Sequence, residues 1–464
     1  NKLNMCGING FYSKSLSMYN DVIFKMNSAI SHRGPDSNGV WFDKSAGIVF
    51  GHQRLSIIDL SKAGNQPMLS NSGRYILTYN GEIYNHLKIR EELEKSNYSI
   101  KWLGRSDTET LIQAIEFWGI KDTLKKIEGM FAFGLWDKKK RSLTLARDRI
   151  GEKPLYFGWQ GEGINQVFLF SSELKALKVH PEFKGIINRD AISLQLRHCC
   201  IPAPFSIYKD INKLLPGHFL ELEERDLKEG LLPSSIPYWS LLDNAKYGNN
   251  NQLKKSEIEI QNELEDHLKS SVRKQMISDV PFGAFLSGGI DSSTITALMQ
   301  AQSTNPIKTF TIGFNENEFN EAQFSKKIAA HLGTEHTELY VSSKQAMEVI
   351  PKLPDIYDEP FSQIAKKHVK VALSGDGGDE LFCGYNRYVM SKKFSILYSL
   401  LPLSLRKIIG FSLKSISSKN LDYLSKFLPN AYQYPEFGNK VYKGANALKA
   451  KTIHDLYCIL GANW

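Results

Sequence analysis

Residues 286–293 read Leu-Ser-Gly-Gly-Ile-Asp-Ser-Ser, and an apolar run, Val280–Leu286, leads into them. A helix-like run, Ser292–Gln300, follows the two glycines. This order of strand, glycine turn and helix start directs backbone N–H groups and the positive end of a helix dipole at one point. Such a point suits a polyphosphate. The stretch therefore predicts a strand–turn–helix unit that binds phosphate.

The same eight residues allow a plainer interpretation, a Gly-Gly turn followed by an Asp–Ser helix cap. They do not match the Walker pattern, because no lysine follows the glycines. Asp291 offers a carboxylate beside the turn, where a magnesium counter-ion of a polyphosphate would sit. We favour the phosphate interpretation and keep the helix cap as its alternative.

The length and composition bound the class of protein. The chain has 464 residues, which predicts two or three domains, and 42% of them are hydrophobic, enough for true cores. Its net charge of +9 suits anionic ligands such as nucleotides. Because the basic residues are scattered rather than clustered, nucleic acid is not an expected partner.

The cysteines and the apolar runs bear on location. Five cysteines, an odd number with no Cys-x-x-Cys pair, predict neither a disulfide framework nor a zinc site and favour a reducing, cytoplasmic setting. No apolar run is long enough to span a bilayer, so we expect no membrane segment.

Residues 6–217 are rich in short strand-like runs and predict an α+β domain. One helix is expected from Tyr19 to Ser31, and a second begins at the capping pattern Ser106–Glu109 and ends at Gly119. The expected strands are Ala46–Phe50, Arg74–Tyr79, Phe131–Trp136, Ser142–Arg147 and Val167–Ser171.

A polar segment, 218–262, is the predicted linker, and 263–464 form the predicted second domain. Strands and helices alternate there, which predicts a parallel sheet covered on both faces, with ligands at the carboxyl ends of its strands. The expected elements are strands Ala284–Leu286, Lys308–Gly313, His336–Val341 and Lys370–Leu373, and helices 292–300, Glu321–Leu332 and 343–350.

A second glycine-rich turn, Ser374–Glu380, follows the last of these strands. Its three carboxylates, Asp376, Asp379 and Glu380, would be costly to bury together without a cation. A magnesium ion shared with Asp291 would offset that cost, although a solvated acidic turn is the plainer alternative.

Polar residues near the amino terminus predict an amino-acid site. Arg54 could clamp a carboxylate and Asp107 could bind an ammonium group, and an amino acid carries both. Asn80-Gly81 is either a hairpin turn or an oxyanion hole made of a side-chain amide and a backbone N–H. Cys6 would supply a thiol nucleophile, against the alternative of an ordinary small buried residue.

The thiol of Cys6 needs a base, and no Cys–His pairing stands out. If the chain began at Cys6, its own α-amino group would serve, because that amine titrates near working pH. Asn1–Asn4 and Met5 precede the cysteine here. With these residues attached the amine is an amide and cannot act as the base, so we expect the thiol to be silent if they are retained.

With both groups of residues placed, the chain resembles the glutamine-dependent asparagine synthetases of the class II amidotransferase group. The Ser-Gly-Gly-x-Asp-Ser turn is similar to that of enzymes that cleave ATP between its α and β phosphates. The resemblance runs in order from Cys6 to about Trp464. The matching segments are Met5–Ile8, His32–Asp36, Gly51–Ser56, Tyr79–Glu82, Ser106–Glu109, Ala146–Asp148, Leu286–Ser293 and Ser374–Tyr385.

The resemblance implies an α+β N-terminal-nucleophile hydrolase sandwich that frees ammonia from glutamine, followed by an α/β parallel-sheet ATP pyrophosphatase domain. Cys6 would attack the glutamine amide, and Asn80 with Gly81 would form the oxyanion hole. The residues implied to hold glutamine are Arg54, Leu55, Ile57, Ile58, Glu82 and Asp107.

In the second domain the resemblance implies binding of ATP and magnesium. The residues implied for ATP are Leu286, Ser287, Gly288, Gly289, Asp291, Ser292, Ile312, Ser374 and Gly375. Asp291 and Asp379 would hold the magnesium, and Asp376 matches an acidic position linked to acyl-adenylate formation. Ammonia would cross inside the protein to the activated aspartate and form asparagine.

Two alternatives stay open: an amidotransferase of the same fold that acts on another carboxylate, such as a sugar uronate, and a catalytically silent homologue. The family has about one more helix where Asp358–Phe361 meets residues 362–365, and it continues past Trp464, so we expect an incomplete second domain. A homodimer is allowed, and the sequence does not settle the oligomeric state.

Overall fold

The computed structural model describes all residues except 1–4, 97–99, 315–319, 360–370, 377, 383, 386–400, 426, 428–436, 453–454, 457–458 and 460–464. The junction near residues 361–363, where a helix was expected to be missing, therefore lies outside the described residues. The chain forms two compact units. The first comprises Asn1–Ser193 and Cys200–Gly375, and the second comprises Leu194–Cys199 and Asp376–Trp464.

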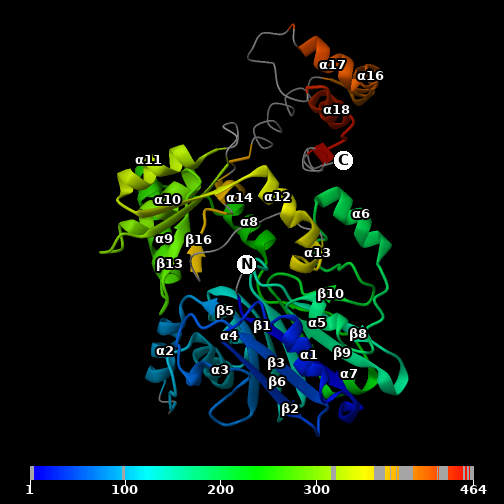
Figure 1. Cartoon of the computed structure of the whole chain (residues 1–464), viewed down its shortest axis with the longest axis vertical. Helices are drawn as coiled ribbons and strands as arrows, with labels where there is room; N and C mark the ends of the chain where they lie inside the picture. Colours follow the sequence, from blue (N-terminus) through cyan, green and yellow to red (C-terminus); the bar gives the residue numbers. More distant parts are fainter. Residues whose placement is uncertain are drawn as a thin grey trace. The chain divides into compact units, whose positions relative to one another are not determined.

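Two antiparallel sheets form the amino-terminal half of the first unit (Figure 1). Sheet A has the strand order β10-β8-β9-β1-β3-β2 in the described part of the chain. Its strands are β1 (Gly7–Ser13), β2 (Ser37–Asp43), β3 (Ile48–Arg54), β8 (Tyr156–Gln160), β9 (Val167–Ser171) and β10 (Asn212–Lys213). Sheet B has the order β12-β11-β7-β6-β5-β4. Its strands are β4 (Met68–Leu69), β5 (Tyr75–Ile83), β6 (Gly129–Asp137), β7 (Ser142–Arg147), β11 (His218–Leu222) and β12 (Ile236–Pro237).

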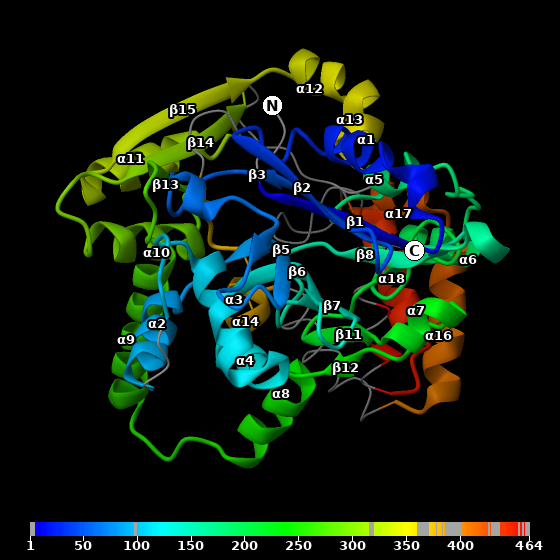
Figure 2. The same cartoon turned by 90° about the horizontal axis from the view of Figure 1, so that it is seen from below.

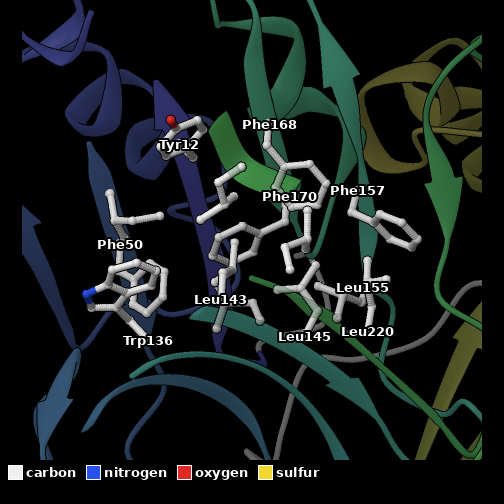
Figure 3. Close-up of a cluster of buried hydrophobic side chains, with 14 of the residues drawn as sticks. Tyr12, Phe50, Trp136, Leu143, Leu145, Leu155, Phe157, Phe168, Phe170 and Leu220 are labelled. Atoms are coloured by element: carbon white, nitrogen blue, oxygen red, sulfur yellow. The ribbon is translucent and has the colours of Figure 1, made fainter. Parts of the chain in front are cut away.

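The two sheets pack face to face because both turn apolar side chains inward. Phe50 and Phe170 of sheet A meet Trp136 and Leu145 of sheet B in one buried cluster (Figure 3). Phe50 and Phe170 lie edge to face, with ring centroids 5.5 Å apart. Removing such rings from water stabilises the sandwich by about 2–3 kcal/mol each.

Helices cover the outer faces of both sheets. The helices α1 (Val22–Ala29) and α5 (Leu174–Lys178) pack on sheet A, and α3 (Asp107–Trp118) packs on sheet B. These four layers confirm the predicted α+β sandwich.

The helix predicted from Ser106 begins and ends as its sequence requires. The Ser106 hydroxyl accepts a hydrogen bond from the N–H of Glu109 at 3.2 Å, which satisfies one of the free donors at the start of α3. Gly119 ends the helix at a φ of 78°, a conformation that a side chain would disfavour. The next helix, α4 (Ile120–Lys126), starts directly afterwards.

Part of the segment predicted as a linker is sheet. The strand β11 pairs with β7 and β12 pairs with β11, so sheet B extends through Pro237. Phe219 and Leu222 are buried in it, which the acidic residues around them concealed in the sequence. The helices α7 (Glu224–Glu229), α8 (Leu241–Asn250) and α9 (Glu257–Gln275) follow along the segment. The boundaries of the domains stay a proposal.

A parallel sheet follows, as the alternation of elements predicts. Its order is β15-β14-β13-β16 within the described residues, and every pairing in it is parallel. Figure 2 labels β15, β14 and β13 of this sheet. The strands are β13 (Phe282–Phe285), β14 (Lys308–Phe314), β15 (Glu335–Val341) and β16 (Val371–Leu373). The connecting helices are α10 (Ile290–Gln300) and α11 (Ala322–Leu332). Met299 and Val272 bury against Ala284, so helices α10 and α9 share a core with this sheet.

The remaining elements of the first unit are short. They are η1 (Leu16–Tyr19), η2 (Lys62–Gly64), α2 (His86–Lys95), η3 (Gly163–Asn165), α12 (Ser343–Val349), η5 (Ile350–Lys352) and α13 (Leu353–Ile356). The helix α6 (Arg189–His198) begins in this unit. The described part of the second unit is helical, with α14 (Gly378–Phe382), α16 (Leu403–Ser415), α17 (Ser418–Ser425) and α18 (Phe437–Ala447). None of the described helices has both the length and the apolar character needed to cross a membrane.

Candidate active site

One cavity of about 260 Å³ collects the residues predicted for the amino-terminal site. All nine predicted catalytic and glutamine-binding residues of that site line it: Cys6, Arg54, Leu55, Ile57, Ile58, Asn80, Gly81, Glu82 and Asp107. They come from the start of β1, the end of β3 with the loop after it, β5 and the first turn of α3. Segments that are far apart in the sequence therefore meet at one point, as a binding site requires.

Cys6 lies just before β1, and its sulfur contacts the loop after β3. The N–H of Leu55 points at Sγ from 3.3 Å, and the thiol faces the carbonyl of Leu55 at 3.5 Å. Arg33 donates from Nε to the carbonyl of Cys6 at 2.9 Å and so fixes the main chain. Burial raises the pKa of the Cys6 thiol, although the bond from Leu55 and the charge of Lys153 oppose that effect. The resting thiol is protonated and needs a base.

Asn80 and Gly81 lie inside β5, opposite Ala132 and Phe131 of β6. The alternative that they form a hairpin turn is therefore wrong, because the strand continues through them to Ile83. Asn80 is 1% exposed, and its Nδ2 has no hydrogen-bond partner among the described residues. A buried donor without a partner is costly, so this amide is suited to an oxygen of a bound molecule.

The register directs the N–H of Gly81 into the same cavity. Tyr79 and Ile83, two residues to either side, donate their N–H groups to the side chains of Gln66 and Asp107, away from β6. Alternate residues of a strand share one hydrogen-bonding edge, so the N–H of Gly81 faces that edge as well. The two donors predicted for an oxyanion hole thus lie on one wall.

Arg54 is buried, and its guanidinium holds the loop that follows it. Nη1 donates to the carbonyl of Ser61 and to Oδ1 of Asn65 at 2.9 and 3.0 Å, and Nη2 donates to the carbonyl of Asp59. These bonds shape the loop that carries Leu55 and Ile57. The predicted clamp on a substrate carboxylate stays a prediction, with fewer free donors than the sequence suggested.

Two carboxylates, Glu82 and Asp107, lie close together in the cavity. Asp107 accepts from the hydroxyl of Tyr79 at 2.7 Å and from the N–H of Ile83 at 2.9 Å. Burial, and then repulsion from Asp107, raise the pKa of Glu82 to about 7. A cationic group of a ligand would favour the charged form of Glu82, so the pair suits an α-ammonium group.

Lys153 also lines the cavity, and the sequence did not single it out. Its side chain is 5% exposed, and its Nζ lies 3.2 Å from Sδ of Met5. Burial lowers the pKa of Lys153, while the charge of Glu82 opposes the change. A lone lysine in the loop after β7 carries no local pattern that predicts burial, so only the folded structure identifies it.

The predicted phosphate turn has the expected form of strand, glycines and helix start. Gly288 has a φ of 82°, and Gly289 is the residue that precedes α10. Inside the turn, the hydroxyl of Ser292 lies 3.0 Å from the hydroxyl of Ser287 and accepts from the N–H of Ser287 at 3.2 Å. Asp291 lies in the first turn of α10, where the predicted magnesium would sit.

The turn that follows β16 lies against this loop. Because β16 pairs with β13, their carboxyl ends are neighbours. A Cβ on Gly375 would lie 2.7 Å from the nitrogen of Ser292, so only a glycine permits this approach. Leu286 directly follows β13, and its N–H donates to the carbonyl of Phe310 of β14 at 2.9 Å, two residues before Ile312. Ser374 immediately precedes Gly375. The residues predicted for ATP thus lie at the carboxyl edge of one sheet.

The predicted magnesium carboxylates divide between the two units. Asp291 belongs to the first unit, whereas Asp376 and Asp379 belong to the second. Within the described residues, no three side chains of His, Cys, Asp or Glu gather in a way that could hold a metal ion. The shared magnesium site of Asp291 and Asp379 therefore stays a prediction. The close approach of Gly375 to the backbone of Asp291 and Ser292 does bring the two turns predicted for ATP together.

Comparisons with known proteins extend over both halves of the chain. Residues 5–239 match the glutamine amidotransferase domain family, and residues 263–453 match the asparagine synthase family. A provisionally named glutamine-hydrolysing asparagine synthetase of Methanocaldococcus jannaschii is 37% identical over 88% of this chain and 81% of its own length. Asparagine synthetase 1 of Bacillus subtilis is 36% identical over 83% of this chain, which spans 59% of that relative.

Among solved structures, a glutamine phosphoribosylpyrophosphate amidotransferase from B. subtilis matches 74% of this chain and 92% of its own. Its identity is 13% and its TM-score 0.37, so neither fold nor function is inferred from it. The two family matches and the 37% identity to the Methanocaldococcus jannaschii relative show the family. The chain belongs to the family of glutamine-hydrolysing asparagine synthetases.

Proposed function

We propose that the protein is a glutamine-dependent asparagine synthetase. It hydrolyses glutamine to glutamate and ammonia, activates aspartate with ATP as an acyl-adenylate with release of pyrophosphate, and amidates it with release of AMP. The observation that carries this proposal is the single cavity that holds Cys6 with every residue predicted to bind glutamine. A cytoplasmic location is part of the proposal, in keeping with the odd number of cysteines.

In the glutaminase half, Sγ of Cys6 attacks the carbon of the glutamine side-chain amide. The α-amino group of Cys6, free when Cys6 is the first residue, takes the thiol proton and returns it to the departing nitrogen. Nδ2 of Asn80 and the N–H of Gly81 stabilise the oxyanion of the tetrahedral intermediate. Water then hydrolyses the thioester and releases glutamate.

Glu82 and Asp107 hold the α-ammonium group of glutamine in this proposal. The main chain from Leu55 to Ile58 lines the same cavity, and Arg54 keeps that loop in shape. Ion pairing with the substrate would lower the pKa of Glu82 toward its ordinary range, so binding and ionisation support one another. This assignment rests on the cavity lining and on the two facing carboxylates.

In the synthetase half, the N–H groups of the turn from Ser287 to Ser292 receive the phosphates of ATP. Leu286, Ile312 and the turn Ser374-Gly375 hold the adenylate part; the contact of Gly375 with the backbone of Ser292 supports this, because it brings that turn beside the phosphate turn. Asp291 and Asp379 would hold magnesium, which neutralises phosphate charge while pyrophosphate leaves. Asp376 takes the position linked to acyl-adenylate formation.

The proposed path of ammonia begins in the glutamine cavity of the first unit. Phe285 of β13 and Ala372 of β16 form part of the wall of the glutamine cavity. These strands lead to the two turns proposed for ATP. Ammonia freed beside Cys6 thus starts next to the strands that lead to the activated acid.

Pyrophosphate release in a full-length protein tests the acceptor. With ATP, magnesium and ammonia, aspartate is expected to drive release and asparagine to appear, whereas a nucleotide-linked uronate is expected to be inert. Release with the uronate but not with aspartate would replace asparagine synthesis by amidation of another carboxylate. No release with any acid would favour a silent homologue.

Cys6→Ala tests the two-site arrangement. Glutamine-driven asparagine formation should disappear and ammonia-driven formation should persist, because the thiol acts only on glutamine. Mass spectrometry of the active protein checks the base, since Cys6 must be its first residue. Equal loss of both activities would contradict two separate sites.

A further inference from the structure

A second cavity, of about 490 Å³, opens at the other end of the strand that Cys6 precedes. Its walls come from the end of β1 with η1, the β2–β3 turn, the β6–β7 turn and α7. A strand rises about 3.3 Å per residue, so the length of β1, Gly7–Ser13, places this cavity on the order of 20 Å from the thiol of Cys6. No residue of the glutamine cavity or of the ATP turns lines it.

Four cations from four separate segments line this cavity: Lys14, Lys44, Arg141 and Lys228. One carboxylate, Glu224, is shared between Arg141 and Lys228 at 2.8 Å from each. Within the described residues, Lys14 and Lys44 have no ion-pair partner. Asp43 adds a second carboxylate beside the cavity, where it accepts from the hydroxyl of Ser45 at 2.7 Å and from the N–H of Ala46 at 3.0 Å. The four cations therefore outnumber the neighbouring carboxylates, and a bound anion relieves the remaining repulsion between them.

Two of the side chains that line this cavity, Arg141 and Tyr12, are held in place by the surrounding structure. Arg141 is fixed by two bonds, from Nε to Glu224 at 2.8 Å and from Nη2 to the carbonyl of Ser45 at 3.2 Å. Tyr12 is 5% exposed, with its ring in the core between the sheets and against Trp159. Its hydroxyl points away from the labelled core side chains in Figure 3. Tyr12 lines the cavity, so a rigid hydroxyl joins the cations.

We propose that this cavity binds the phosphate group of a small phosphorylated molecule. Ligand pockets of several hundred Å³ take molecules up to the size of a nucleotide, which suits 490 Å³. Lys14 and Lys44 supply free ammonium groups, Arg141 supplies a preset guanidinium, and Tyr12 donates its hydroxyl. The site is separate from the proposed reaction and does not depend on it. The strand β1 links it physically to Cys6.

Equilibrium dialysis of the full chain against labelled inorganic pyrophosphate, without magnesium, tests the proposal. The double substitution Lys14→Ser and Lys44→Ser removes the two unpaired cations, both on exposed positions. Lys138→Ser with Lys139→Ser removes the same charge from the exposed turn beside Arg141, outside the cavity. We expect the Lys14 and Lys44 double variant to lose one bound pyrophosphate, or to bind it about tenfold more weakly. The Lys138 and Lys139 double variant should bind it as the wild type does.

Tyr12→Phe keeps the ring in the core and removes only the hydroxyl, and it should weaken the same binding event about threefold to tenfold. Competition then separates the sources of phosphate: displacement by AMP indicates a nucleotide ligand, and displacement by orthophosphate indicates any phosphate. If both lysine double variants lose the same pyrophosphate affinity, the effect comes from the net charge of the protein and the proposed site is wrong. Unchanged binding in the first pair would also overturn the site.

Discussion

The main-chain N–H of Asp59 donates a 2.8 Å hydrogen bond to the carboxylate of Asp279. Asp279 in turn donates its own N–H to the carbonyl of Ile57 at 2.9 Å. Ile57 lines the cavity that holds Cys6, and Asp279 lies just before β13, the strand that leads to the phosphate turn. This reciprocal pair fastens the wall of one proposed site to the strand of the other.

Asp279→Ala is expected to loosen that wall. Loss of the carboxylate leaves the N–H of Asp59 without its acceptor, which costs about 1 kcal/mol and raises KM for glutamine about fivefold. Steady-state kinetics with glutamine and with ammonia measure the effect, and ammonia-driven turnover should change less. The matched control is Arg105→Ala, which removes only an exposed 3.9 Å ion pair with the same carboxylate. Equal effects of the two substitutions would count against the backbone contact.

Asn80→Ala should separate catalysis from stability. The Nδ2 of Asn80 is buried without a partner in the described structure, so its removal costs the folded protein no internal hydrogen bond from that nitrogen. Loss of an oxyanion donor should lower kcat for glutamine hydrolysis about 100-fold or more. The melting temperature should stay within about 2 °C of the wild-type value, or rise.

Asn85→Ala is the control for that experiment. Asn85 donates to the carbonyl of Lys126 and accepts from the N–H of Glu128, both at 2.9 Å, and does not line the cavity. Its loss should lower stability by about 1–3 kcal/mol and leave kcat nearly unchanged. If Asn80→Ala instead destabilises the protein and leaves kcat intact, Asn80 has a structural role only.

Glu82→Gln should reveal the cost of burying a charge. The pKa of Glu82 is about 7 in the folded protein against an ordinary value of 4.5, because burial and Asp107 disfavour the charged form. The unfolded chain therefore releases this proton at lower pH than the folded chain, and stability falls as pH rises from about 4.5 to about 7. The glutamine variant avoids that loss.

The expected result is a pH-dependent gap between variant and wild type. Thermal unfolding of Glu82→Gln should match the wild type near pH 4.5 and gain up to about 3 kcal/mol by pH 8. Glutamine binding should weaken most above about pH 7, where the wild-type Glu82 is charged and the neutral amide pairs poorly with an ammonium group. The exposed Glu91→Gln serves as the matched control for the same chemical change outside the cavity. A constant gap for Glu82→Gln would disprove the raised pKa.

Local patterns made much of the fold predictable. The strands Ser142–Arg147 and Val167–Ser171 have the bounds expected from their alternation, and Ser106 and Gly119 delimit α3 as capping chemistry requires. These features depend on a few neighbouring residues. The predicted alternation of strands and helices after residue 280 holds for the same reason, because each strand and helix carries its own period.

Features that depend on distant contacts were less predictable. The strand His218–Leu222 lies in an acidic stretch and is stabilised by pairing with β7, which no local pattern reveals. Burial of Lys153 and the raised pKa of Glu82 arise only when segments that are distant in the sequence enclose one cavity. Asn80-Gly81 reads as a turn pair in sequence, but pairing with Ala132 and Phe131 keeps it extended.

Gly375→Ala tests the contact between the two turns proposed for ATP. The added Cβ would lie 2.7 Å from the nitrogen of Ser292 and 2.8 Å from the carbonyl carbon of Asp291, both backbone atoms that cannot rotate aside. The phosphate turn must shift, and a misplacement of about 1 Å costs on the order of 100-fold in a positioned reaction. ATP–pyrophosphate exchange should therefore collapse while glutamine hydrolysis at Cys6 persists. Gly248→Ala meets no atom within 4 Å and, as a helix position in α8, should leave exchange unchanged. Full exchange in Gly375→Ala would show that the turn after β16 does not contribute to the nucleotide site.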